Sequence, residues 1–190
     1  MVVGHWARSP FGPFSDVMIE RHDGHRVLLA PSRETADFIA GTYTFDEVRV
    51  VPVRADVAGR EWTVRASSLG LRFVAGRRGL VGLLLRAVPG PLAARPAWAA
   101  SVALPARVLL GVRTRGRAGR GRYEWYGAKD LWPVVAASAG YEGQDLGHLA
   151  PVVPPVRFGF GSPPRRPSVV RVTVTVSLER ENGGAARDTA

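Results

Sequence analysis

Alternation of apolar and polar residues is the feature that most constrains the fold of this 190-residue chain. The clearest example is PSVVRVTVTVSLE (167–179), in which valines alternate with Arg, Thr and Ser. The segments REWTVRAS (60–67) and LGLRFVAG (69–76) follow the same pattern. Successive side chains of a strand point to opposite faces, so this period of two predicts strands with one buried face.

Short links separate these strands, and this favours antiparallel pairing. One link, Asp23-Gly24, joins two β-rich runs and predicts a hairpin with a two-residue type I′ turn. We count eight to ten strands and two to four short helices, without a repeated βαβ pattern. The predicted fold class is mainly β, or β-rich α+β: an antiparallel barrel-like sheet or a two-sheet sandwich, with two to four short helices.

One helix is expected within SRETADFIAGTY (32–43). Ser32 is a typical N-cap residue, because its hydroxyl accepts a hydrogen bond from a free amide of the first turn. Ala36, Ile39, Ala40 and Tyr43 fall on one face of such a helix and predict docking on a sheet.

The length and the apolar content predict a single β-rich domain over residues 1–180, followed by a disordered polar tail at 181–190. The N-terminus lacks a charged region followed by an apolar run, so we expect no signal peptide and a cytoplasmic location. The most apolar stretch, 79–112, is interrupted by three arginines and four prolines. We therefore expect no transmembrane segment, and one or two short helices there.

The positive charge of the chain is concentrated in its middle third. Residues 62–123 hold twelve arginines and no acidic residue, whereas the flanking parts are close to balanced. Such a strip attracts nucleic acid, anionic lipid or an anionic small molecule. However, 25 of the 26 basic residues are arginine, a bias typical of a GC-rich genome, which places arginine at ordinary surface positions. We therefore rank nucleic-acid binding behind the binding of a small molecule.

Motifs for metal, phosphate or nucleophilic chemistry are weak. The chain has no cysteine, and His22 and His25 flank a turn with only Asp23 beside them, whereas zinc needs three or four ligands. There is no G-x-S-x-G nucleophile elbow, and GRAGRG (116–121) lacks the GK[ST] ending of a phosphate-binding loop. We expect neither a metal nor a cofactor.

Lys129 is the only lysine in the chain, and lysine can lose its proton in a desolvated site, whereas arginine cannot. The segment GRYEWYGAKDL (121–131) resembles the region around the Schiff-base lysine of the acetoacetate decarboxylase family. The resemblance implies a catalytic role for Lys129 and a barrel-like antiparallel sheet. Two positions depart from the family pattern: Ala128 replaces a proline, and Asp130 replaces a second lysine that helps to lower the pKa of the first.

Glu124 is the first acidic residue after the acid-free segment, and it is a second candidate for catalysis. If it faces an interior beside Arg113 or Arg115, it can hold a ligand or a proton. The alternative is a cross-strand ion pair on the solvated face of a hairpin.

The first functional hypothesis is a domain that binds a small apolar or anionic ligand in an apolar pocket with a basic rim. The alternatives are an enzyme that uses Lys129 or Glu124 in the same cavity, and a nucleic-acid-binding protein that uses residues 62–123. The oligomeric state is left open. The expected ligand-binding residues are Trp62, Phe73, Trp98, Arg113, Arg115, Trp125, Tyr126, Phe158 and Phe160.

Overall fold

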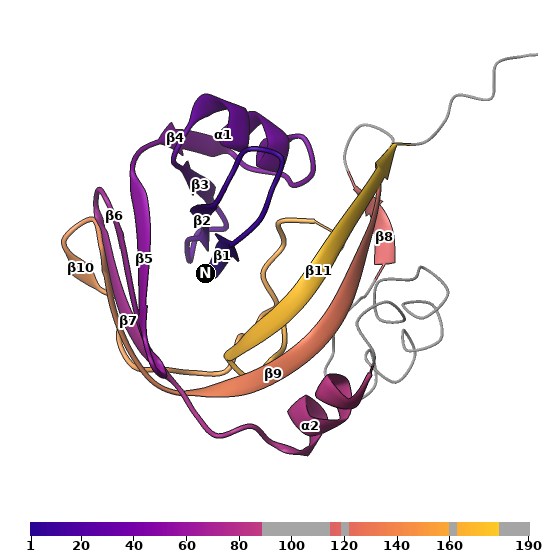
Figure 1. Cartoon of the computed structure of the whole chain (residues 1–190). Coiled ribbons are helices and arrows are strands. Elements are labelled where there is room, and N and C mark those ends of the chain that lie inside the picture. Colours follow the sequence, from indigo (N-terminus) through magenta and orange to yellow (C-terminus); the bar gives the residue numbers. More distant parts are fainter. Residues whose placement is uncertain (89–114, 119–121, 160–162, 179–190) are drawn as a thin grey trace, which may run out of the picture.

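Two β-sheets and two helices make up the computed structural model of the protein (Figure 1). The strands that it describes do not close into a barrel, so the two-sheet form of the predicted mainly β class is confirmed. The structure describes residues 1–88, 115–118, 122–159 and 163–178. Only the backbone is described for residues 115–118, 122–125 and 175–178.

The first sheet is formed by the N-terminal quarter of the chain, in the order β1-β2-β3-β4. The strands β1, β2 and β3 are antiparallel, but β4 runs parallel to β3. A parallel neighbour needs a crossover, which is provided by helix α1 (Arg33–Ala40). The bounds are β1 Val2–Trp6, β2 Phe14–Glu20, β3 Arg26–Ala30 and β4 Glu47–Val50.

The helix expected within 32–43 is confirmed as Arg33–Ala40, but Ala40, predicted for its buried face, is exposed, and Tyr43 follows its end. The hydroxyl of Ser32 accepts a hydrogen bond from the backbone amide of Thr35, and the Thr35 side chain in turn accepts one from the Ser32 amide. This reciprocal cap fixes the start of α1. Ala36 and Ile39 are buried against Leu28 and Ala30 of β3, so α1 covers one face of the first sheet.

The second sheet has the order β10-β9-β7-β6-β5, and β8 and β11 also pair with β9. The chain enters it through Pro52, which has no amide hydrogen to continue the ladder of β4. The antiparallel pairing predicted for the strands at 60–67 and 69–76 is confirmed for β6 and β7, and β5 pairs antiparallel with β6. The bounds are β5 Val53–Ala58, β6 Glu61–Ala66, β7 Leu69–Ala75, β8 Arg115–Ala118, β9 Arg122–Tyr141, β10 Gln144–Asp145 and β11 Ser168–Leu178.

Strand β9 is longer than the sequence suggests. The sequence predicts a strand over RYEWYGA (122–128) followed by a short loop, but the chain continues as one strand of 20 residues that curves around the molecule (Figure 1). Its N-terminal half pairs with β11 and β8, and its C-terminal half pairs with β7. Conversely, the alternation in RFGFG (157–161) predicts a short strand, whereas Phe158 lies in a bend.

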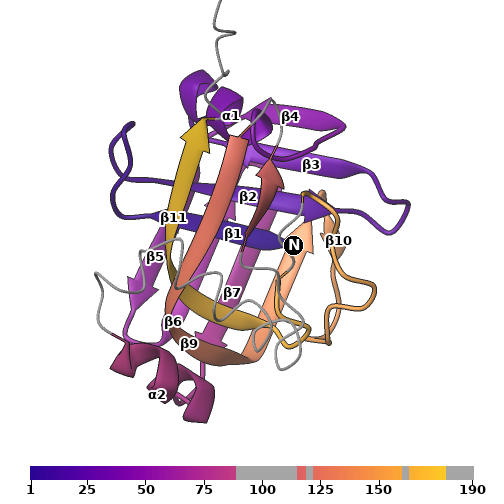
Figure 2. The same ribbon diagram turned by 90° about the vertical axis from the view of Figure 1, so that its right-hand side faces the viewer.

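The two sheets cross each other, with the strands of the first running crosswise over those of the second (Figure 2). Between them lies the main core, formed by Val17, Ile19, Val27, Leu29, Val64, Ala66, Leu69 and Tyr141. Fully burying an aliphatic side chain contributes about 1.5–3 kcal/mol, so this layer dominates the packing. The first sheet is thus buried on both faces, by the second sheet and by α1.

The hairpin predicted at Asp23-Gly24 is confirmed, but the prediction of a two-residue turn is wrong. The Arg21 amide donates to the His25 carbonyl, so His22, Asp23 and Gly24 form a three-residue loop, with Gly24 alone at positive φ. The expected type of turn occurs instead at Glu142-Gly143, where both residues have positive φ and Tyr141 pairs with Gln144.

Helix α2 (Leu80–Ala87) packs on β9. It is one of the helices expected within 79–112, and residues 89–112 lie outside the described part of the chain. Gly82 is the buried residue of the helix, and a Cβ there would lie 2.3 Å from the Leu131 carbonyl oxygen. Neither described helix has the length and apolar content needed to span a bilayer.

Candidate functional site

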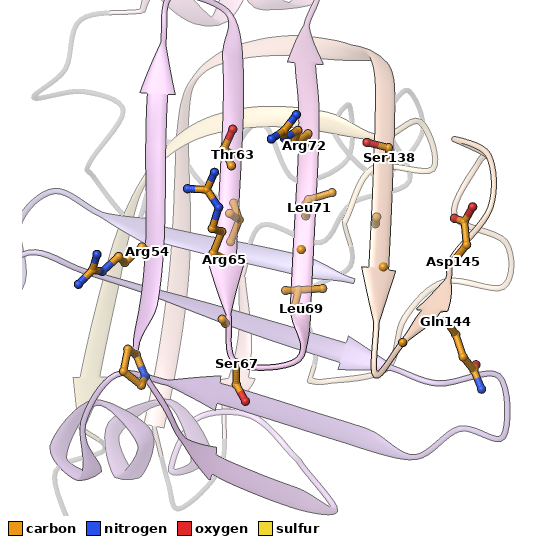
Figure 3. A pocket seen from close by; sticks show the side chains of 17 residues that line it. Arg54, Thr63, Arg65, Ser67, Leu69, Leu71, Arg72, Ser138, Gln144 and Asp145 are labelled. Atoms are coloured by element: carbon orange, nitrogen blue, oxygen red, sulfur yellow. The ribbon is translucent and has the colours of Figure 1, made fainter.

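A shallow depression of about 870 Å³ lies on the second sheet (Figure 3). It extends over β5, β6, β7, β9 and β10, and we call it the sheet depression. Its outward-facing and turn residues include Arg54, Thr63, Arg65, Gly70, Arg72, Ser138, Gly140, Gln144 and Asp145.

Three arginines lie on the same face of the sheet because of the registers of neighbouring strands. Arg54 pairs with Arg65 across β5 and β6, and Arg72 of β7 pairs with Thr63 on one side and Ser138 on the other. Residues that pair across strands share a face of the sheet, so all three guanidinium groups belong to the outward face. Each of these arginines is exposed.

Two glycines form a flat part of the depression. Gly70 pairs with Gly140 on β9, and Gly70 also pairs with Arg65 on β6. A Cβ built at Gly70 meets no atom within 4 Å, so the space above it is open. A ligand can therefore approach the sheet backbone beside the arginines more closely than other side chains would allow.

The charge of the depression is positive on one side. Arg65 lies 3.5 Å from Asp56, in an exposed ion pair of the kind that contributes little. Among the described residues, Arg54 and Arg72 form no ion pair. Asp145 lies at the other end, where its carboxylate accepts a hydrogen bond from the Gly147 amide at 2.9 Å.

The β9–β10 turn, which carries one end of the depression, is anchored to the first sheet by Glu142. The Glu142 carboxylate accepts hydrogen bonds from Arg49 at 2.7 Å and from Arg21 at 2.9 Å. The hydrogen bond from Arg49 is the main cause that lowers the pKa of Glu142 below its ordinary value. The two sheets are thereby joined beside Gly143 and Gln144, which line the depression.

Two of the expected ligand-binding residues, Trp62 and Phe73, lie together on the inward face of the second sheet. Their rings stack with centroids 5.6 Å apart, and the His5 ring lies nearly perpendicular to the Trp62 ring. Phe73 also packs against the main core. Both residues therefore pack between the sheets, and neither lines the sheet depression.

Tyr126 and Phe158 occupy a different place, where β9 and the loop before β11 approach α1. The hydroxyl of Tyr126 is hydrogen-bonded to that of Tyr43. Phe158 is buried, its ring lies 5.7 Å from Phe45, and its carbonyl accepts a hydrogen bond from the Thr44 amide. The predicted aromatic wall is thus divided between two regions.

Lys129 is the extra residue of a β-bulge in β9. In the pairing with β11, Val172 lies opposite Ala128 and Arg171 lies opposite Asp130, so Lys129 has no partner residue. Its side chain is partly buried. Bulges re-aim side chains and often occur beside active sites.

Asp130 does not pair with Lys129. Its two carboxylate oxygens accept hydrogen bonds from the guanidinium group of Arg78 at 2.7 and 2.9 Å, and Arg78 also lies over the Trp132 ring. This bidentate bond lowers the pKa of Asp130, which is itself buried. Asp130 therefore holds the segment before α2 against β9.

The remaining predicted site residues are placed only in part. In the β8–β9 pairing, Arg115 lies opposite Trp125 and Glu124 lies opposite Gly116, with the backbone alone described. These registers put Arg115 and Glu124 on opposite faces, because adjacent residues of a strand alternate. Trp98, Arg113 and Phe160 lie outside the described residues.

One buried carboxyl group was not predicted as a candidate. Asp16 of β2 is 1% exposed, and one oxygen accepts a hydrogen bond from the Trp6 indole nitrogen at 2.8 Å. The other oxygen has no hydrogen-bond partner. Burial raises the pKa of Asp16 to about 6, against the smaller lowering effect of the bond from Trp6. Because Asp16 is buried out of reach of a ligand, its protonation affects the stability of the folded protein.

The residues of the sheet depression were not predicted either, although part of the signal is present in the sequence. The alternation places Arg65 with Thr63, and Arg72 with Gly70, on the polar faces of adjacent strands. The contributions of Arg54 and Ser138 follow only from the registers of β5 and β9.

The described residues contain no group of three or more His, Asp or Glu side chains placed to hold a metal ion. Comparisons of the chain with protein-family models, with curated proteins and with solved structures give no match.

Proposed function

We propose that the protein binds a small anionic ligand in the sheet depression. The observation that carries the proposal is that Arg54, Arg65 and Arg72 lie on one outward face of the sheet, beside the pair Gly70 and Gly140, with open space above Gly70. The volume of about 870 Å³ is within the range of sites that bind small molecules, about 300–1,000 Å³.

The preference for an anion follows from the arginines. A guanidinium group presents its donors in a planar fork that matches a carboxylate or a phosphate. Arg54 and Arg72 have no acidic partner among the described residues, so their donors are available. Thr63 and Ser138 add hydroxyl groups opposite Arg72 in the register.

A compact ligand fits this face better than a single-stranded nucleic acid. Proteins that bind single strands stack the bases on aromatic side chains. The described outward positions of β5, β6 and β7, and of the part of β9 that pairs with β7, include no aromatic residue. This face therefore offers charge and a flat surface, but no platform for bases.

The experiment begins with native mass spectrometry of the purified protein to identify a copurified small molecule. Two probes, a phosphate monoester and a dicarboxylate, are then titrated and followed by the NMR shifts of the Gly70, Ser138 and Gly140 amides. We expect Arg72→Gln to weaken binding about tenfold, because it removes a charge-assisted contact. Arg60→Gln is the matched control, since Arg60 is exposed and lies outside the depression.

Gly70→Phe provides a test that leaves the charges unchanged. The new side chain enters open space, so the fold is expected to be retained while the depression is filled and binding is lost. Equal affinities for the wild type, Arg72→Gln and Gly70→Phe would place the ligand elsewhere and refute the proposal.

A second candidate function is supported by the bulge at Lys129. We propose that the amine of Lys129 condenses with the carbonyl group of a keto acid, releasing water and forming an imine. The bidentate bond from Arg78 occupies both oxygens of Asp130 and leaves Lys129 without a paired carboxylate among the described residues. Borohydride reduction with pyruvate, followed by mass analysis, should give a stable adduct at Lys129. An unmodified Lys129 excludes this function.

A further inference from the structure

Helix α2 differs from an ordinary surface helix, which buries its apolar side chains and exposes its polar ones. It buries its glycine, Gly82, against β9 and exposes three of its four leucines to solvent. Leu80, Leu83 and Leu84 are 73%, 53% and 62% exposed. We call these three residues the leucine face.

The leucine face is continuous because residues at i, i+3 and i+4 lie on the same side of a helix. Gly82 falls on the opposite side, which contacts the Leu131 carbonyl. A contiguous apolar patch on a surface marks a place of interaction, whereas single exposed apolar residues need no explanation. The helix also lies at the end of the molecule opposite α1, at the edge of the fold (Figures 1 and 2).

The charge around the leucine face is positive. Arg77 precedes the helix and Arg86 lies in its last turn, and both are exposed. Among the described residues, neither forms an ion pair, and the nearby Asp130 is buried and bound by Arg78.

We propose that α2 binds the surface of an anionic lipid bilayer, with the leucine face among the upper acyl chains and Arg77 and Arg86 at the lipid phosphates. Apolar residues on one side and arginines beside them are the pattern of helices that lie in the membrane interface. Three leucines alone give weak, reversible binding, so the arginines and anionic lipid are required as a second attraction.

The positive charge also favours an anionic lipid surface over a second copy of the chain as the partner of the leucine face. A symmetric dimer through the leucine face would bring Arg77 and Arg86 of one copy against the same residues of the other. No described carboxylate lies free at this face to offset that repulsion, whereas anionic lipid offsets it directly. The proposal uses residues other than those of the sheet depression and does not depend on the function proposed for it.

The test is flotation of the full-length protein with vesicles of phosphatidylcholine alone and with vesicles that also contain phosphatidylserine. We expect the wild type to float with the anionic vesicles only, and to be released as salt screens the charges. Leu80→Ser, Leu83→Ser and Leu84→Ser together should reduce the partition coefficient about tenfold or more, because three apolar contacts are lost. Arg77→Gln with Arg86→Gln should give a similar loss on anionic vesicles.

Two controls keep the result specific. Val48→Ser with Val50→Ser removes apolar residues of comparable exposure, 46% and 49%, from β4, and should leave flotation unchanged. Arg65→Gln with Arg72→Gln tests whether the arginines of the sheet depression hold the lipid instead. Urea unfolding of each variant verifies that the fold is retained.

Absence of flotation with anionic vesicles overturns the proposal. Flotation that survives the leucine substitutions, or that is lost with Arg65→Gln and Arg72→Gln, also overturns it. If the wild type instead sediments as a dimer that the leucine substitutions dissociate, and does not bind vesicles, then the face serves self-association and the proposal is wrong.

Discussion

The stability of the protein should fall as the pH rises through about 6, because of one buried carboxyl group. Asp16 has its pKa raised by burial from 3.8 to about 6 in the folded protein. The folded state therefore binds this proton more tightly than the unfolded state does. The resulting stabilisation is fully present below pH 3.8 and is lost as the pH passes through about 6.

The magnitude follows from the shift of about two pKa units, which corresponds to about 3 kcal/mol between low and high pH. At pH 5, about one unit below the folded pKa, the contribution is about 1 kcal/mol, and at pH 8 it is close to zero. Asp16→Asn removes the titration and retains an oxygen that can accept the hydrogen bond from Trp6. The unfolding free energy of the wild type, relative to the variant, should therefore decrease by about 1 kcal/mol from pH 5 to pH 8.

Urea unfolding followed by tryptophan fluorescence measures this difference at each pH. Asp46→Asn is the control, because hydrogen bonds from Arg26 lower the pKa of Asp46 and keep it ionised throughout pH 5–8. The difference between wild type and Asp46→Asn should thus stay constant over that range. If the difference for Asp16→Asn is also constant, Asp16 does not titrate as argued and the reasoning is refuted.

Three further changes test contacts of the fold. Gly82→Ala should destabilise the protein by about 1–3 kcal/mol in thermal unfolding, because its Cβ would lie 2.3 Å from the Leu131 oxygen, whereas Gly70→Ala faces open space and should not. Arg78→Gln should lower the midpoint of urea unfolding at neutral pH. Arg77→Gln is the control and should leave the midpoint unchanged. The loss caused by Arg78→Gln should shrink in acid, because the stabilisation from the lowered pKa of Asp130 disappears as the pH falls through it. A double-mutant cycle of Tyr43→Phe and Tyr126→Phe should give a coupling of about 1 kcal/mol in urea unfolding, and strictly additive losses would show that the hydroxyls are not bonded.

Local patterns predicted the elements well, because they depend on neighbours in the sequence. The Ser32 cap, the β2–β3 hairpin and the alternation in β6, β7 and β11 all reflect interactions within a few residues. The parallel pairing of β3 with β4 was not predicted, because it depends on how α1 packs. The continuity of β9 was missed because glycine, proline and a lone lysine interrupt its alternation, whereas pairing on both sides keeps it extended.

The candidate site was harder to predict because it depends on registers between distant strands. Trp62, Phe73 and Phe158 were expected to line a pocket since large aromatics often do, but the two sheets and α1 use them for packing. Arg72 meets Ser138 only because β7 pairs with a strand more than 60 residues later in the chain. No pattern within either segment specifies that pairing.

The main core has a consequence for how the protein can change over evolution. Of its eight residues, only Tyr141 comes from beyond Leu69, so the first 75 residues encode nearly all of the layer between the sheets. Arg54, Arg65 and Arg72 of the depression belong to that same segment, whereas the bulge at Lys129 and helix α2 follow it. Substitutions of exposed residues in the later part can thus alter the surfaces at Lys129 and α2 while the layer between the sheets keeps its residues.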